Sequence, residues 1–479
     1  MRTPPWALAF AVALASSCSA EDSPGGGGAG GSGGGAGSGG EGGGVSADAS
    51  VDAGGDAGPA ACPTSPETTE PPAADPGTPS LPPTLDCGTP AFPAGSPLRR
   101  YPYLQAVDGA SASILWTTTG GSSPTVRVAP SASGPWQSFA AATEAFPVSR
   151  TADSVDYEQH HAEVTGLGPG TAYCYEVLMD GQPVATNLRF ETAFRERSRP
   201  VRVLAFGDSG SGSDDQKAVR DRFSQDGFDL FLGLGDLAYG SGTFVEFETN
   251  HFDIYRDFMH RVPHFGVLGN HEYKTDGGQP YLDMLHHWAQ AWRPADQERY
   301  YSFDYGNVHF VALDSNPELL LPIQLDDLGG GSVKDDMVDW LRDDLARSTA
   351  EWKIAFFHHP PFTSSTRGDN AQLIATVLPV LEAAGVDFVL VGHDHHYERT
   401  HRMLGHCPTM PGGTRAIPYV IVGTGGAGIR DAAQGEPHAA KVIPLIHGYL
   451  RFVVHGCRGT GEFVDRTGAV LDSFQITGC

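Results

Sequence analysis

Residue types that bind metal ions follow five short apolar runs between residues 201 and 391. They are Asp208 after Phe206-Gly207, Asp236 and Tyr239 after Leu234-Gly235, Asn270 and His271 after Leu268-Gly269, His358 and His359 after Phe357, and His393 and His395 after Val391-Gly392. Each segment alone is more typical of a turn or a helix cap than of a ligand. Five of them together indicate one metal site, because side chains that follow the strands of an open α/β sheet meet at its carboxyl edge.

The apolar runs have the length and composition of strands buried in an α/β sheet. The predicted strands are residues 201–206, 228–234, 265–268, 353–357 and 388–391, and helical patterns lie between them at 335–348 and 370–384. Pro379 must bend or interrupt the second helix. Residues 448–476 alternate in polarity, with turns predicted at Arg458-Gly459 and Thr467-Gly468, and should close the domain as antiparallel strands. Residues 200–479 are therefore predicted to form a layered α/β domain.

The preceding region, residues 100–193, reads as a small all-β sandwich of short strands separated by turn residues. Examples are the segments 112–117, 125–128 and 172–177. A strand-borne Trp116 and the corner from Leu167 to Tyr173 resemble a fibronectin type III-like module. Such a fold says little about activity, and support or spacing is its default role.

The order of the polar motifs resembles the metallophosphoesterase superfamily, and in particular its purple acid phosphatase branch. The generic superfamily usually opens with Asp-X-His, whereas here Ser209 and Gly210 follow Asp208. Gly-Asp-X-Gly at 207–210, Gly-Asp-X-X-Tyr at 235–239 and Gly-His-Asp-His-His-Tyr-Glu-Arg at 392–399 are similar to the purple acid phosphatase pattern. The resemblance covers nearly everything from Arg100 onward. It implies an α/β fold of the four-layer metallophosphoesterase type, a β-sandwich flanked by helices, preceded by the small all-β module.

The resemblance also implies two metal ions, each with four ligands. The first, ferric iron in the family, would be held by Asp208, Asp236, Tyr239 and His395, an oxygen-rich set that suits a hard trivalent ion. The second, a divalent Zn, Fe or Mn ion, would be held by Asp236, Asn270, His358 and His393. Asp236 would then bridge the two ions.

The activity that follows is hydrolysis of phosphate monoesters, with hydroxide generated at the two metals as the nucleophile. The substrate would be a phosphorylated small molecule or another phosphoester. We expect His271 to contact the substrate phosphate and assist the leaving oxygen, the alternative being a hydrogen-bond partner of a ligand. We expect His359 to face away from the site, since it neighbours His358 on an extended segment.

The sequence departs from the family pattern after the His-His-Pro segment. Purple acid phosphatases usually place further histidines there, but residues 362–369 contain none. Arg367 is the candidate to bind phosphate instead, because a guanidinium grips two oxygens without titrating. It cannot act as a general acid, so we expect less acid-dependent activity, or a preference for diesters or better leaving groups.

The N-terminal residues predict export and attachment to a surface. Residues 1–18 read as a signal peptide whose Ala-Ser-Ser-Cys end resembles a bacterial lipobox, with a lipid anchor at Cys18; an unlipidated signal peptide is the alternative. A Gly/Ser-rich tether, 19–60, and a Pro-rich linker, 61–99, follow. The predicted location is the outer membrane or cell surface, otherwise the periplasm or the medium.

The charge limits the kinds of binding partner, and the cysteine content predicts disulfide bonds. The formal net charge of −26 argues against nucleic acid, whose phosphates are held by clustered Lys and Arg. Apart from the lipid anchor, no apolar run is long enough to span a membrane. Six further cysteines, an even number in an exported chain, predict up to three disulfides whose pairing is open: Cys62, Cys87, Cys174, Cys407, Cys457 and Cys479.

Three other functions remain open at this stage. A phosphodiesterase or nucleotidase would use the same two metals and differ in its pocket. A binding lipoprotein without catalysis would not need a complete ligand set. Structural metal ions that only stabilise the fold would not need this mixture of Asp, Asn, His and Tyr.

Overall fold

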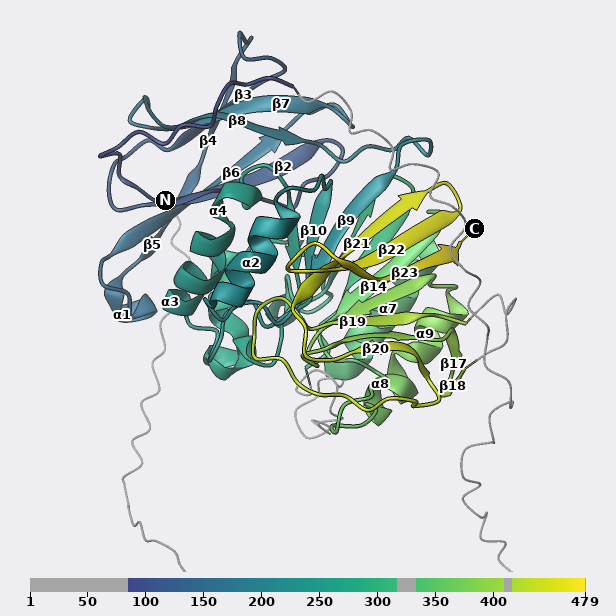
Figure 1. Ribbon diagram of the computed structural model, residues 1–479. Helices are drawn as coiled ribbons and strands as arrows, with labels where there is room; N and C mark the ends of the chain where they lie inside the picture. The colour runs from purple at the N-terminus through teal and green to yellow at the C-terminus, as the bar shows by residue number, and fades with distance from the viewer. Residues whose placement is uncertain (1–84, 317–332, 409–415, 479) are drawn as a thin grey trace, which may run out of the picture. The chain divides into compact units, whose positions relative to one another are not determined.

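The computed structural model describes residues 85–316, 333–408 and 416–478, shown in colour in Figure 1. The predicted signal peptide, Cys18, the tether and most of the Pro-rich linker lie outside the described residues, as do Cys62 and Cys479. Within the described ranges, no helix is both long and apolar enough to cross a membrane.

The first part of the described chain is the predicted all-β sandwich. One sheet has the order β1 (Leu98–Gln105), β2 (Ser111–Thr118), β6 (Tyr157–Thr165), β5 (Ala142–Phe146), and the other has the order β4 (Gln137–Ala140), β3 (Thr125–Ala129), β7 (Ala172–Met179), β8 (Gln182–Glu191). Trp116 lies on β2, fully buried between the sheets. The predicted corner is present, since the Gly168 N–H donates to the Tyr173 hydroxyl at 2.8 Å.

Disulfide bonds occur in this part and beyond it. Cys87 is bonded to Cys174 and ties the segment before β1 to β7. Cys407 and Cys457 are also disulfide-bonded. Disulfides persist in oxidising compartments such as the periplasm or the cell exterior, which agrees with an exported chain.

Two mixed sheets form the centre of the second part, which is drawn beside the sandwich in Figure 1. The six-stranded sheet has the order β11 (His264–Gly266), β10 (Leu230–Gly233), β9 (Val201–Phe206), β21 (Gly448–His455), β22 (Arg458–Asp465), β23 (Val470–Thr477). The seven-stranded sheet has the order β12 (Tyr301–Tyr305), β13 (Val308–Ala312), β14 (Trp352–Phe357), β15 (Phe388–Val391), β19 (Tyr419–Val422), β16 (Tyr397–Thr400), β20 (Ala439–Ile443). Strands β9, β10 and β11 run parallel to one another, as do β13, β14, β15 and β19.

The two sheets pack face to face because their inward residues are large and apolar. On β15, Phe388 and Leu390 belong to the core between the sheets, whereas Val389 and Val391 point to the opposite side. Phe388 stacks on Phe452 of β21 with ring centroids 4.6 Å apart, so the contact crosses from one sheet to the other.

Helices cover both outer faces and complete the four predicted layers. Helices α2 (Asp214–Phe223) and α4 (Asp253–Met259) pack on the six-stranded sheet, where Phe223 lies 5.5 Å from Phe206. Helices α7 (Val333–Arg347), α8 (Ala371–Thr376) and α9 (Leu378–Ala383) share a core with the outer face of the seven-stranded sheet. The remaining short elements are α1 (Val148–Thr151), α3 (Phe244–Phe247), α5 (Gln279–Met284), single helical turns at Glu248–Phe252, Glu272–Lys274, Asp276–Gly278 and Pro294–Asp296, and the hairpin β17 (Met403–Leu404) with β18 (Cys407–Pro408).

The predicted fold class is confirmed. As expected, the helix predicted at 370–384 is divided before Pro379, which occupies the first turn of α9. One local prediction is corrected. The first turn of the C-terminal strands is not at Arg458-Gly459, because these residues already belong to β22. It falls at Gly456-Cys457, where Gly456 takes a positive φ of 55°.

The sandwich and the α/β part meet through buried polar contacts. The Arg100 guanidinium donates to the Glu248 carboxylate, and the Tyr175 hydroxyl donates to the His260 carbonyl at 2.7 Å.

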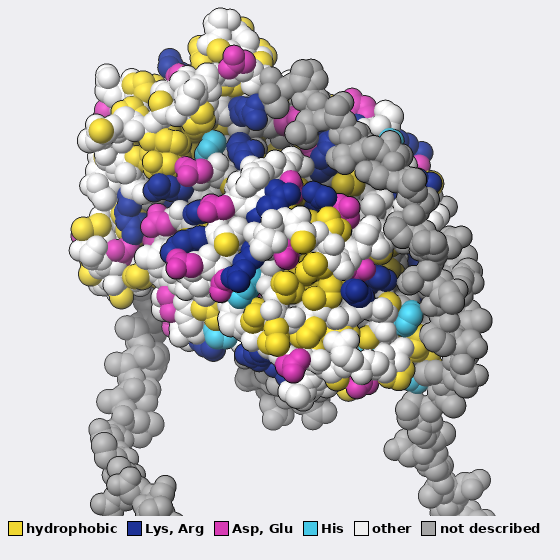
Figure 2. Space-filling model, in the orientation of Figure 1, with side chains coloured by type: hydrophobic (Ala, Val, Ile, Leu, Met, Phe, Trp, Pro, Cys, Tyr) yellow, Lys and Arg dark blue, Asp and Glu magenta, His cyan; other side chains and the backbone are white. Residues whose placement is uncertain are grey.

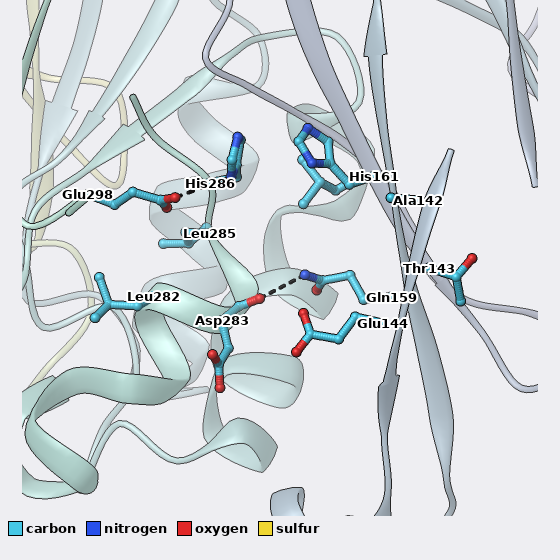
Figure 3. A pocket seen from close by; sticks show the side chains of 11 residues that line it. Ala142, Thr143, Glu144, Gln159, His161, Leu282, Asp283, Leu285, His286 and Glu298 are labelled. Atoms are coloured by element: carbon cyan, nitrogen blue, oxygen red, sulfur yellow. Dashed lines mark hydrogen bonds and ion pairs between the residues drawn. The ribbon is translucent and has the colours of Figure 1, made fainter. Parts of the chain in front are cut away.

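A cavity of about 290 Å³ lies between β5 and β6 on one side and residues 282–298 on the other (Figure 3). His161 and His286 face each other there with ring centroids 4.3 Å apart. None of the predicted metal ligands lines this cavity.

Candidate metal centre

The predicted ligands follow the carboxyl ends of parallel strands from both sheets. Asp208, Asp236 and Asn270 follow β9, β10 and β11, while His358 and His393 follow β14 and β15. Two contacts join these edges: the Gly207 N–H donates to the Val422 carbonyl at 2.9 Å, and the His393 N–H donates to Asp208 Oδ2 at 2.7 Å. The site is therefore built where the two sheets meet.

The Tyr239 hydroxyl is the centre of one group of side chains. It donates to Asp208 Oδ1 and to Asp236 Oδ2, at 2.9 Å each, and lies 3.1 Å from His395 Nε2. His395 Nε2 is also 3.2 Å from Asp208 Oδ1. These four side chains are the set predicted for the first metal.

The other oxygen of Asp236 faces a second group. Asp236 Oδ1 is 3.4 Å from His358 Nε2, which lies 3.3 Å from Asn270 Oδ1 and 3.3 Å from His393 Nδ1. The ligand atoms of Asp208, Asp236 and His358 all lie within 4.8 Å of one another. Asp236 thus contacts both groups, one with each carboxylate oxygen, as a bridging ligand would.

The backbone is bent sharply at three of these residues. Asp208, Asp236 and His393 have positive φ angles of 55°, 52° and 67°, a conformation that non-glycine residues seldom adopt and that concentrates at functional sites. Neighbouring glycines allow the close approach: a Cβ at Gly269 would lie 2.2 Å from Asp236 Oδ1, and one at Gly392 would lie 2.7 Å from Asp208 Oδ2.

Two imidazoles are oriented by backbone carbonyls. His358 Nδ1 lies 2.8 Å from the Leu234 carbonyl oxygen, and His395 Nδ1 lies 2.6 Å from that of Gly428. A carbonyl can only accept, so each Nδ1 carries a proton and each Nε2 faces the site. This is the arrangement that metal-binding histidines adopt.

The buried charges of the site call for cations. Burial opposes ionisation of Asp236, but the adjacent His358 outweighs this and holds the pKa of Asp236 well below its usual range. Burial, followed by the charges of Asp208 and Asp236, raises the pKa of Tyr239 well above its usual value. Two carboxylates in the protein interior are costly without positive charge beside them, and metal ions would supply it. The donor set and its burial therefore fit a pair of metal ions.

The two residues predicted to contact substrate lie at the edge of the same site. His271 Nε2 is 3.9 Å from Asp236 Oδ2, and its ring packs against Tyr239 with centroids 4.2 Å apart. Arg367 donates through Nη1 to the His393 carbonyl and to Asp394 Oδ1, both at 3.0 Å. Arg367 is therefore held beside a predicted ligand, with part of its charge offset by Asp394.

The expectation that His359 faces away from the site is wrong. Its ring lies 4.4 Å from that of His393, and nitrogens of His358, His359 and His393 lie within 4.8 Å of one another. His359 Nδ1 is also 3.0 Å from Ser315 Oγ. The segment after β14 bends instead of continuing as a strand, so the alternation of side chains assumed for neighbouring residues does not hold.

Glu272 supports the site in a way that the sequence did not indicate. Its fully buried carboxylate accepts from the backbone N–H groups of four residues in two ligand-bearing loops: Asp236, Leu237, Ala238 and Gly269. It stands in the Gly-Asn-His-Glu segment, but nothing in the sequence shows that two loops converge on it. Lys274, whose Nζ is 2.9 Å from His271 Nδ1, was missed for the same reason.

Comparison with known proteins agrees with this geometry. Residues 201–397 match the family "Calcineurin-like phosphoesterase", and residues 97–192 match "Purple acid Phosphatase, N-terminal domain". The chain therefore contains a calcineurin-like phosphoesterase domain preceded by a purple acid phosphatase N-terminal domain, which confirms the resemblance predicted from the motifs.

Individual relatives cover part of the chain. Purple acid phosphatase 18 of Arabidopsis thaliana is 25% identical over 260 residues, which are 51% of this chain and 53% of that protein. Purple acid phosphatase 15 of the same plant is 26% identical over 305 residues, 56% of this chain and 53% of that protein. The chain thus spans about half the length of these curated relatives.

Solved structures share the fold at low sequence identity. A purple acid phosphatase from yellow lupin seeds superposes with a TM-score of 0.67 at 19% identity, covering 82% of this chain and 75% of that one. PhoD superposes with a TM-score of 0.56 at 14% identity, covering 80% of this chain and 94% of that one.

Proposed function

We propose that the protein is a two-metal phosphoesterase that hydrolyses phosphate monoesters. The observation that carries the proposal is the position of Asp236, whose two oxygens contact two separate groups of ligand-type side chains. The two matched domains and the relatives named purple acid phosphatase support the same conclusion.

In the proposed site, Asp208, Tyr239 and His395 hold one ion, Asn270, His358 and His393 hold the other, and Asp236 bridges them. The oxygen-rich first set suits Fe(III), and the second suits a divalent Zn, Fe or Mn ion. When bound, the two ions would acidify a water so that it can attack phosphorus, and would offset the charge of the phosphoryl oxygens.

The remaining residues would bind and orient the substrate. His271 Nδ1 lies 2.8 Å from the Gly240 carbonyl oxygen and 2.9 Å from Lys274 Nζ, which leaves Nε2 on the side of Asp236. From this position Nε2 can donate to a phosphoryl or leaving oxygen when it is protonated. Arg367 can offer its remaining guanidinium N–H groups to phosphate from the side of His393.

Phosphodiester or nucleotide hydrolysis on the same site is the second candidate, favoured by the absence of histidine from residues 362–369. Without a further acid near the leaving group, a substrate with a better leaving group would react faster. Location at the outer membrane through lipid on Cys18, or otherwise in the periplasm or the medium, remains part of the proposal.

The proposal is tested by turnover of para-nitrophenyl phosphate and bis(para-nitrophenyl) phosphate by metal-loaded wild type and Asp236→Asn. We expect the monoester to be the better substrate. The substitution should lower kcat/KM by on the order of 10³, because a neutral amide cannot bridge two cations.

Asp257→Asn is the matched control, since Asp257 is an exposed carboxylate on α4. It should retain wild-type turnover. A faster diester reaction would favour the second candidate, and equal activity of the Asp236 and Asp257 variants would refute the two-metal mechanism.

A further inference from the structure

His359 lies at the metal centre but is not among the ligands of the proposed site. It follows β14, directly after the predicted ligand His358, and is only 9% exposed. Pro360 comes next, and a residue before proline is confined to extended backbone conformations, so the chain fixes where this side chain starts. A buried imidazole so close to the ligands calls for a function.

The rings of His358, His359 and His393 converge. Their centroids lie 4.4 to 5.0 Å apart in the three pairs, at interplanar angles of 47° to 81°. One nitrogen from each ring lies within 4.8 Å of the other two, and His358 Nε2 and His393 Nδ1 are 3.3 Å apart. Zn–N bonds of about 2.1 Å allow two ligand nitrogens to be about 4.2 Å apart, so small ring rotations bring all three nitrogens to one ion.

Ser315 orients His359 as backbone carbonyls orient His358 and His395. Ser315 Oγ lies 3.0 Å from His359 Nδ1 and accepts from the His359 backbone N–H at 2.9 Å. Among the described residues, Nε2 of His359 has no hydrogen-bond partner. Because metal-binding histidines use their second ring nitrogen for such an orienting contact, Nε2 is the nitrogen left for a metal.

The three imidazoles belong to the centre already described. In the described part of the chain, two groups of three His, Cys, Asp or Glu side chains are close enough to share an ion, and both contain His358: one with Asp208 and Asp236, the other with His359 and His393. Lys and Arg side chains are interleaved with Asp and Glu on the face drawn in Figure 2, so that face offers no extended acidic patch for metal ions. The group with His359 therefore lies on the side of the second metal.

We propose that His359 is a fifth protein ligand of the second metal, so that three imidazoles bind this ion and the site selects zinc over manganese. This inference rests on the proposed two-metal phosphoesterase function. Nδ1 of His359 carries the proton and donates to Ser315 Oγ, and Nε2 binds the ion. Imidazole suits zinc, which can accept five ligands, whereas manganese prefers carboxylate and water oxygens.

The test measures the affinity of the second site for zinc and for manganese, by competition with a chelator, in full-length protein loaded with iron. The variants are His359→Phe, which removes both ring nitrogens, and Ser315→Ala, which removes the orienting hydroxyl. His161→Phe is the matched control, because His161 also lies 2.9 Å from a serine hydroxyl but lines the cavity beside the sandwich, away from the predicted ligands.

We expect His359→Phe to lower the zinc affinity by on the order of 10²-fold and Ser315→Ala to lower it by ~10-fold, the range in which changes around metal-bound histidines act. Manganese affinity should fall by less, so the preference for zinc narrows. His161→Phe should keep both affinities. Unchanged zinc affinity in His359→Phe, or an equal loss in His161→Phe, would overturn the inference.

A second measurement does not depend on how the variants fold. X-ray absorption at the zinc edge of wild-type protein that holds one iron and one zinc counts the imidazoles bound to zinc. Three imidazoles support the assignment of His359, and two refute it.

Turnover separates this inference from the proposed function. If wild type binds zinc through three imidazoles but does not hydrolyse para-nitrophenyl phosphate, the ligand assignment stands and the phosphatase proposal fails. If wild type hydrolyses this substrate and His359→Phe keeps its zinc affinity, the phosphatase stands and the role of His359 is refuted.

Discussion

Three buried histidines away from the metal centre predict that the fold loses stability in acid. His251 lies in the turn Glu248–Phe252, His264 on β11, and His287 after α5, each at most 1% exposed. Neither ring nitrogen of His251 or His264 has a hydrogen-bond partner among the described residues, and the two rings lie 5.0 Å apart. Only the neutral imidazole is tolerated in such surroundings.

The sign and size of the effect follow from the pKa shifts. Burial lowers the pKa of His251 and of His287 to about 3, with Arg100 and His286 as lesser causes, and it lowers that of His264 well below its usual value. The unfolded chain binds protons near pH 6.5, so the stability from each neutral histidine is complete above that pH and is lost as the pH falls towards 3. At pH 5 each of these histidines lowers the free energy of unfolding by ~2 kcal/mol relative to pH 8, and the three together lower it by ~6 kcal/mol.

The assay is urea unfolding of wild type and His251→Phe at pH 8 and pH 5. His251 lies among Phe247, Phe252 and Tyr255, so a phenyl ring suits its surroundings. The pH-dependent loss of unfolding free energy should be ~2 kcal/mol smaller in the variant. Protonation of the metal ligands affects both proteins alike and cancels in this difference.

The exposed His455→Gln serves as the control and should keep the wild-type pH dependence. The reasoning is refuted if His251→Phe loses as much stability between pH 8 and pH 5 as wild type does. That outcome would mean that His251 is protonated in the folded protein despite its burial.

Two further predictions concern activity. Glu272→Gln keeps one acceptor oxygen but turns an amide N–H towards backbone donors, so the loops that bear Asp236 and Gly269 should shift. We expect kcat/KM for para-nitrophenyl phosphate to fall by on the order of 10², and elemental analysis to find fewer metal ions per chain. Unchanged metal content with full activity would contradict this positioning role. Because Arg367 stands where the family usually places titrating histidines, a pH–rate profile should be flat from mildly acidic to alkaline conditions, whereas a sharp acidic optimum would count against it.

The fold was predictable wherever one residue pattern determined one element. The strands β9 and β15 have the predicted limits, because short runs of apolar residues, interrupted in β9 only by Arg202, favour a buried strand over a helix by their length. The interruption before Pro379 followed from the chemistry of proline. The first turn of the C-terminal strands was predicted at Arg458-Gly459 but lies at Gly456-Cys457. Both Gly456 and Gly459 suit a turn, and only the pairing of β21 with β22 decides between them.

The site was predictable as a set of residues but not in its supporting contacts. Each predicted ligand lies in the loop that follows a strand, so its position depends on local sequence and on the strand order. The contacts of Glu272 and Lys274 depend instead on how loops from different strands approach one another. His359 shows the same limit, because its direction is set by a bend in the chain and by Ser315.

The most direct test of the two-metal site is the metal content and visible spectrum of the full-length protein and of Tyr239→Phe, with para-nitrophenyl phosphate turnover followed in the same samples. We predict about two metal ions per chain, as paired-metal hydrolysis requires, with at least one iron. A broad visible absorption from the ferric phenolate should be lost in Tyr239→Phe. Two bound metals with turnover but without colour would remove the ferric assignment alone. A protein that binds no metal and shows no turnover after reconstitution would contradict the account.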